Sequence, residues 1–163
     1  MVLDIGQPVG SKAPDFDLPT ESGKMVRLSD LRGRIVMLAF YPSDFGMMCA
    51  VELRGLKERY SELRQLCDLL PISTNTTYSH GAFSIALDLP FALLSDVDGS
   101  ASKKYGVYAP EDDGYLGGGR CYRAIFIIDT EGTVHYRWVP DDPGQEPVYE
   151  ELLDALKELN GLR

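Results

Sequence analysis

An uninterrupted apolar run from Ile35 to Tyr41 is the feature that most limits how this chain can fold. Seven apolar residues with no polar alternation are typical of a strand that is buried on both faces of a sheet covered by helices. The segment that follows is amphipathic, with apolar residues at steps of three and four: Leu53, Leu56, Tyr60 and Leu63. A buried strand followed by a helix to about Leu66 predicts an α/β fold.

Cys49 lies where this strand ends and the helix begins. The first turn of a helix offers unpaired N–H groups and the positive end of its dipole, and both stabilise a thiolate. With a cationic neighbour, such positions lower a thiol pKa from about 8.5 to roughly 3.5–7.5. Cys49 is therefore a candidate nucleophile. The alternative is a core cysteine, because the same helical spacing places Cys49 on the inward face.

The rest of the chain alternates predicted strands and helices. The predicted strands are 13–19, 25–28, 69–73, 91–96, 122–129 and 133–139, and the predicted helices are 77–87 and 147–160, with a helical turn at 29–33. Pro71 has no N–H to give to a ladder, so it indicates an edge or a bulge. Residues 108–120 are expected to form a mobile surface loop. This order predicts a thioredoxin-like fold: a central mixed sheet flanked by helices, preceded by an amino-terminal β-hairpin.

Composition narrows the function. A chain of 163 residues that is 44% hydrophobic predicts one domain, residues 1–163. The net charge of −9 argues against nucleic acid and anionic membranes as partners. No signal peptide or membrane span is expected, and three cysteines do not resemble a secreted disulfide scaffold, so we expect a cytoplasmic location.

The segment Pro42-x-x-x-Gly46-x-x-Cys49 resembles the peroxidatic motif of the peroxiredoxins, the alkyl hydroperoxide reductase and thiol-specific antioxidant family. The resemblance extends to the Ala-Pro-Asp-Phe segment at 13–16, and the chain is closest in appearance to the bacterioferritin-comigratory-protein-like subgroup. It implies a thiol-dependent peroxidase that reduces hydrogen peroxide or organic hydroperoxides through a Cys49 sulfenic acid. Gly46 departs from the motif, because the family carries Thr or Ser there.

Arg123 is the expected cation. It lies at the start of a strand apolar on both faces, and a buried Arg needs an anionic partner; the alternative is an Arg that extends to solvent. The resemblance implies that Arg123 points at Cys49, that Glu52 orients Arg123, and that Pro42 shields the sulfur. Gly46 and Met48 are expected to border the peroxide.

The sequence leaves the recycling of Cys49 open. Cys121 precedes Arg123 by two, so in an extended strand both would share a face, and Cys121 is a possible resolving cysteine. Position 54, a resolving position in one branch of the subgroup, is Arg54, and Cys67 is interpreted as a core residue. Otherwise an external thiol, such as a thioredoxin- or glutaredoxin-like protein, reduces the sulfenic acid. A monomer or homodimer is expected.

Three alternatives compete with the peroxidase. A disulfide reductase would need a second cysteine three residues from Cys49, where the chain has Gly46 and Glu52. A cysteine hydrolase would need a histidine base, but His80 is expected at the surface and His135 on a polar strand face. The third is a peroxiredoxin-like binding or redox-sensing module with little turnover, favoured by Gly46. No metal, nucleotide or flavin is expected.

Overall fold

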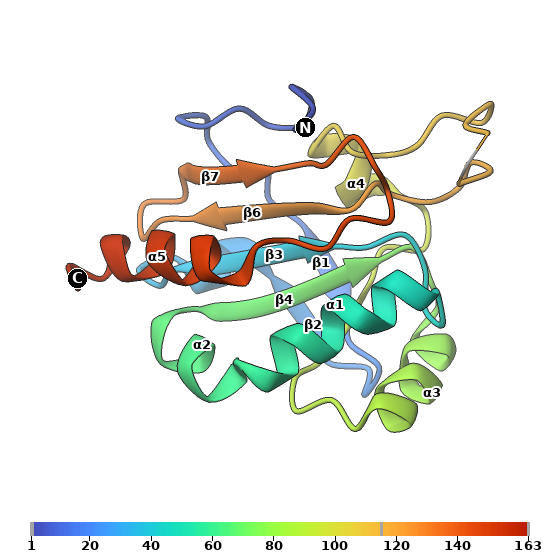
Figure 1. The fold of residues 1–163 in the computed structure, drawn as a ribbon, viewed down its shortest axis with the longest axis horizontal. Coiled ribbons are helices and arrows are strands. Elements are labelled where there is room, and N and C mark those ends of the chain that lie inside the picture. The colour runs from blue at the N-terminus through green and yellow to red at the C-terminus, as the bar shows by residue number, and fades with distance from the viewer. Residues whose placement is uncertain (1, 115, 163) are drawn as a thin grey trace.

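The computed structural model describes residues 2–114 and 116–162, and its centre is a five-stranded sheet in the order β5-β4-β3-β6-β7 (Figure 1). The strands are β3 (Val36–Phe40), β4 (Asp68–Ser73), β5 (Leu94–Ser95), β6 (Ala124–Ile128) and β7 (Val134–Trp138). β3 pairs parallel with β4 and antiparallel with β6, so the sheet is mixed. β1 (Asp17–Pro19) and β2 (Met25–Arg27) form a separate antiparallel hairpin. The predicted fold class is confirmed.

Helices cover both faces of this sheet (Figure 1). They are the 3-10 turn Leu28–Leu31, α1 (Met47–Glu58), α2 (Tyr60–Leu66), α3 (Thr77–Leu87), α4 (Ser100–Lys104) and α5 (Tyr149–Leu159). α1, α2, α3 and α5 pack on one face, while α4 and the hairpin pack on the other. No helix in the described part of the chain is long and apolar enough to cross a membrane.

β3 supplies side chains to both cores, as its unbroken apolar run predicted. Met37 and Ala39, with Tyr41 directly after the strand, belong to the core under α1, and Val36, Leu38 and Phe40 belong to the core on the other face. Each of these side chains is no more than 2% exposed. Because β3 has a neighbour on each edge and a core on each face, the chain that leaves it starts from a rigid support.

Two local predictions need correction. The expected single helix to Leu66 is interrupted at Arg59, which separates α1 from α2. Its guanidinium lies 4.2 Å from the centre of the Tyr149 ring, a contact between segments far apart in sequence that helical periodicity does not predict. β4 is interior to the sheet, so Pro71 does not mark an edge strand. Its missing N–H is tolerated because the short β5 pairs only with Ile72 and Ser73.

Candidate active site

Cys49 lies at the edge of the sheet where β3 and β4 end and β6 begins. It is the third residue of α1, whose N-cap is Gly46, so the predicted place in the first turn is confirmed. Its side chain is only 4% exposed and packs in the core beneath α1. The sulfur is therefore close to the unpaired N–H groups of the helix start, but largely shielded from water.

Arg123 lies next to Cys49, although 74 positions separate them in the chain. One guanidinium nitrogen, Nη2, donates to the Cys49 sulfur at 3.5 Å, and Nη1 donates to Glu52 Oε1 at 2.7 Å. The third, Nε, donates to the Pro143 carbonyl oxygen at 3.0 Å. The predicted proximity of Cys49 and Arg123 is confirmed. Arg123 is 3% exposed, so the alternative of a side chain extending to solvent is wrong.

Burial and charge have opposite effects on the pKa values of Cys49, Arg123 and Glu52. Burial raises the pKa of the Cys49 thiol, and Arg123 and a hydrogen bond with the Ser43 backbone oppose this only in part. The prediction of a lowered pKa is therefore wrong for this conformation. Burial also raises the pKa of Glu52 against the effect of Arg123, whereas Glu52 and Cys49 outweigh burial and raise the pKa of Arg123. Arg123 is thus the group that most favours a thiolate at Cys49.

The remaining motif residues differ in their burial and in their distance from the Cys49 sulfur. Pro42 is buried in the connection between β3 and α1, and Met48 is half-buried in the first turn of α1. A Cβ atom added to Gly46 would lie 3.3 Å from the Cys49 sulfur and 3.2 Å from the Ser43 carbonyl oxygen. A side chain at position 46 would therefore contact the sulfur directly.

Cys121 does not share a face with Arg123, and that prediction is wrong. Cys121 is fully buried in the core opposite Cys49, and its thiol donates to the Tyr41 carbonyl oxygen at 3.1 Å. The alternation fails because β6 begins only at Ala124, while Cys121 pairs with Tyr108 in an isolated bridge. All three cysteines are free, and Cys67 is buried in the core as predicted.

His80 is the functional candidate that sequence reasoning missed. It was expected at the surface, but it is fully buried, with Nδ1 2.8 Å from Asp44 Oδ2. The signal was present in the spacing of His80, Phe83 and Leu87, which marks the inward face of α3. His135 is half-buried on β7, and its Nε2 lies 3.6 Å from Glu158 Oε1, so it faces α5 and not Cys49.

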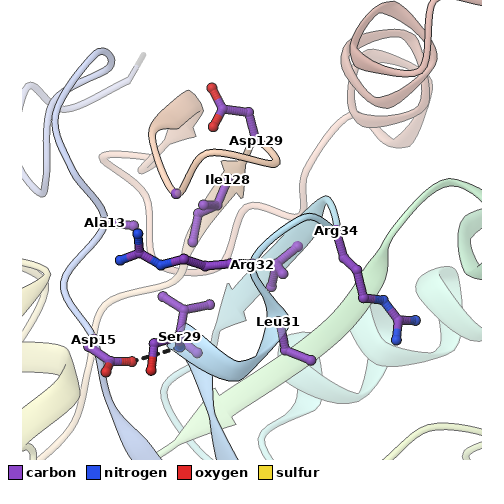
Figure 2. A pocket seen from close by; sticks show the side chains of 11 residues that line it. Ala13, Asp15, Ser29, Leu31, Arg32, Arg34, Ile128 and Asp129 are labelled. Atoms are coloured by element: carbon purple, nitrogen blue, oxygen red, sulfur yellow. Dashed lines mark hydrogen bonds between the residues drawn. The ribbon is translucent and has the colours of Figure 1, made fainter.

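A small cavity at the other end of the sheet is not part of this site. Figure 2 shows Arg32 extended between Ile128 and Ser29, while Arg34 points away. The cavity has a volume of about 20 Å³, which holds roughly one water molecule. Val36 and Ile128 line it, and they are the first residue of β3 and the last of β6, so it lies a strand's length from Cys49.

Residues 9–137 match the AhpC/TSA family model, a segment that contains both Cys49 and Arg123. The chain belongs to the AhpC/TSA family, the peroxiredoxins. It is 38% identical over 135 residues to a Coxiella burnetii protein named as a peroxiredoxin bcp, covering 80% of this chain and 87% of that protein. This similarity agrees with the predicted likeness to the bacterioferritin-comigratory-protein-like subgroup.

Solved structures of peroxiredoxins have the same fold. The crystal structure of Peroxidoxin BcpB from Mycobacterium tuberculosis superposes with a TM-score of 0.76 at 26% identity, covering 95% of this chain and 97% of that one. A peroxiredoxin-like protein from Aquifex aeolicus, at 24% identity, shares the fold with a TM-score of 0.86 over 98% of this chain and 91% of its own. The chain is a thiol-dependent peroxidase, an oxidoreductase, and the comparisons give no support to the binding or sensing module.

Proposed function

We propose that Cys49 is the peroxidatic cysteine of this peroxiredoxin and that Arg123 and Glu52 complete its reacting centre. The observation that carries the proposal is the buried contact in which one guanidinium reaches both the Cys49 sulfur, at 3.5 Å, and Glu52, at 2.7 Å. A thiolate beside a fixed cation is the arrangement that nucleophilic attack on a peroxide requires.

The reaction follows from this geometry. The Cys49 thiolate attacks one peroxide oxygen, a sulfur–oxygen bond forms, and the oxygen–oxygen bond breaks. The departing alkoxide or hydroxide carries the negative charge that Arg123 stabilises, and it leaves as alcohol or water after taking a proton. Cys49 is left as a sulfenic acid. An external thiol then attacks the sulfenic sulfur, releasing water and forming a mixed disulfide that a second thiol reduces.

Other residues shape the site. Glu52 is a positioning residue, since its carboxylate holds the Arg123 guanidinium, and it acts on the sulfur only through its charge, which raises the pKa of Cys49. Pro42 is buried between β3 and α1, which suits a role in shielding the thiolate from water. Gly46 and Met48 border the peroxide, Gly46 through its backbone because no side chain separates it from the sulfur.

Stopped-flow oxidation of the reduced protein tests the proposal. Trp138 packs in the same core as Cys49 and reports the reaction by fluorescence, while mass spectrometry locates the added oxygen. We expect hydrogen peroxide or an organic hydroperoxide to oxidise Cys49 far faster than free cysteine, and Cys49→Ser to abolish the fast phase. Oxidation at the rate of free cysteine, or an unchanged fast phase in Cys49→Ser, would overturn the assignment.

Gly46→Thr is expected to speed oxidation of Cys49 by about tenfold, the worth of roughly one added hydrogen bond in the transition state. The backbone at Gly46 has φ −66° and ψ 138°, which any residue adopts. An added Cβ would lie 3.2 Å from the Ser43 carbonyl oxygen and 3.3 Å from the sulfur, so these neighbours must shift slightly, and they must do so equally for threonine and valine. Gly46→Val is the matched control, since valine has the shape of threonine without the hydroxyl. Equal rates in the two variants would show that the hydroxyl has no role.

Cys121→Ser is expected to leave the oxidation products unchanged. Cys121 is fully buried on the face opposite Cys49, so recycling by an external thiol fits better than a disulfide between them. After one equivalent of peroxide, both the parent and the variant should gain the mass of one oxygen at Cys49. Addition of a sulfenic acid reagent should convert this species into the same Cys49 adduct in both proteins. A Cys49–Cys121 disulfide in the parent would identify Cys121 as the resolving cysteine.

The remaining partners follow from the family and the composition. The substrate is a hydroperoxide, and a thioredoxin- or glutaredoxin-like protein supplies the reducing thiol. The chain acts in the cytoplasm, as a monomer or homodimer of one domain spanning residues 1–163. The net charge of −9 supports a role without nucleic acid, and the burial of Cys67 and Cys121 as free thiols supports a reducing compartment.

A further inference from the structure

Asp44 is the centre of a buried polar network beneath the segment that joins β3 to α1. Its side chain is 1% exposed, and that of His80 is fully buried. Tyr41 donates its hydroxyl to Asp44 Oδ1 at 2.7 Å, and Ser79 donates to Oδ2 at 2.8 Å. The Asp44 N–H also donates to Asn75 Oδ1 at 2.9 Å. Both the backbone and the carboxylate of Asp44 are therefore held by α3 and by the connection that precedes it.

His80 links this carboxylate to the sheet. Nε2 lies 2.9 Å from the Leu94 carbonyl oxygen, which can only accept, so Nε2 carries a proton. Nδ1 lies 2.8 Å from Asp44 Oδ2, and this contact requires a proton between the two atoms. Burial and the Asp44 carboxylate raise the pKa of Tyr41, so the Tyr41 hydroxyl remains a donor. The two ring nitrogens thus fix Asp44 against β5.

The residue that follows Asp44 adopts a backbone conformation that needs such support. Phe45 has φ +63°, in the left-handed region that a bulky residue rarely adopts. Conformations of this kind persist where the surrounding structure holds them, and they concentrate at functional sites. Gly46, the N-cap of α1, comes next, and the Cys49 sulfur lies 3.3 Å from where its Cβ would be. The backbone at 44–46 therefore sets the position of the sulfur.

We propose that Asp44 and His80 are positioning residues of the peroxidase, which hold residues 43–46 so that Cys49 and Gly46 meet the peroxide opposite Arg123. Arg123 fixes the sulfur from the side of β6, and the Asp44–His80 pair fixes it from the side of α3. This inference rests on the proposed role of Cys49, and Asp44 and His80 act through the backbone at 43–46, since their side chains bond to each other, to Tyr41, to Ser79 and to the Leu94 carbonyl oxygen.

Two substitutions at position 80 separate the contacts of the two ring nitrogens, Nδ1 with Asp44 and the Tyr41 hydroxyl, and Nε2 with the Leu94 carbonyl oxygen. His80→Asn keeps a donor at the place of Nδ1, facing Asp44, and His80→Gln keeps one near the place of Nε2, facing Leu94. We expect His80→Gln to slow the oxidation of Cys49 by hydrogen peroxide by about ten- to hundredfold, because small misplacements of a reacting group are costly. His80→Asn should stay within about threefold of the parent, although it leaves the larger cavity.

Alkylation of Cys49 by iodoacetamide, at a temperature where both variants are folded, supplies the second measurement. Iodoacetamide needs an accessible thiolate but no oxygen-binding geometry, so alkylation of His80→Gln should be unchanged or faster while its peroxide rate falls. Equal peroxide rates in His80→Asn and His80→Gln, or a parallel loss of both reactions, would overturn the inference and leave the pair a purely structural role.

Ser79→Ala keeps the test available if neither histidine variant folds. It removes one donor to Asp44 Oδ2 from a half-buried position and leaves no buried charge unpaired. We expect its peroxide rate to fall by only about threefold, with alkylation unchanged, because Tyr41 and His80 still hold the Asp44 carboxylate. An unchanged peroxide rate would overturn the inference. The peroxide rate of the parent protein distinguishes the two proposals. If Cys49 of the parent does not react, the proposed function is refuted before any variant is compared.

Discussion

Arg123→Met is expected to slow the oxidation of Cys49 by hydrogen peroxide by about 10²- to 10³-fold, the usual cost of removing one donor aimed at developing charge. Arg123 opposes the effect of burial on the Cys49 thiol, so its loss raises the pKa of that thiol further. The reactive form is the thiolate, and at neutral pH its fraction falls as the pKa rises. The rate should therefore fall at pH 7, and its profile should shift toward higher pH.

Stopped-flow rates between pH 6 and 10 check this result. Arg137→Met is the matched control, because Arg137 lies in β7 next to β6 but donates to Asp4 and the Gly6 carbonyl oxygen, away from Cys49. Its oxidation rate should stay within about twofold of the parent, as for most substitutions outside a site. A profile for Arg123→Met that overlays the parent would show that the guanidinium has no influence on the sulfur.

Glu52→Ala is expected to lower the free energy of unfolding by about 3–5 kcal/mol, because it leaves the Arg123 charge buried without its carboxylate. Glu52 is fully buried and Arg123 is 3% exposed, so bulk solvent does not compensate the charge that loses its partner. Urea denaturation measures the change. For a chain of this length, the midpoint of thermal unfolding should fall by roughly 10 °C.

Two further variants test why Glu52→Ala loses stability. The double variant Glu52→Ala/Arg123→Met removes both charges, so it should recover part of the stability that Glu52→Ala loses. Glu158→Ala is the surface control, since the Glu158 side chain is 75% exposed and its ion pair with His135 contributes less than about 1 kcal/mol. A double variant no more stable than Glu52→Ala would mean that the unpaired charge is not the cause.

Most of the fold could be predicted because its signals are local. The apolar run at 35–41 gave the two-faced strand β3, and the helix over 77–87 has the bounds that its pattern indicated. The break at Arg59 could not be predicted, because the apolar spacing of Leu56, Tyr60 and Leu63 continues through it without interruption. The prediction of an edge or a bulge at Pro71 failed because the sequence does not show how short β5 is, and the missing N–H of Pro71 is tolerated because β5 pairs only with Ile72 and Ser73.

The site was only partly predictable for a comparable reason. Arg123 was found because a cation in an apolar strand demands an anion, and the motif indicated which one. Cys121 was misplaced because strand alternation was extended through residues that belong to no strand. His80 was assigned to the surface although its spacing with Phe83 and Leu87 places it on the buried face of α3. Charge and periodicity identified the residues, but only the three-dimensional contacts show which of them act together.

The three sulfurs differ in how they should respond to an oxidant. Burial raises the pKa of all three thiols, that of Cys67 to about 12, but at Cys49 a guanidinium opposes the effect of burial. Cys67 is buried in the same core as Cys49 but next to the first residue of β4, whereas Cys121 lies in the core on the other face and donates its thiol to the Tyr41 carbonyl oxygen. We therefore expect repeated exposure to peroxide to oxidise Cys49 before either core thiol, so that scrambled disulfides do not accumulate in the folded chain.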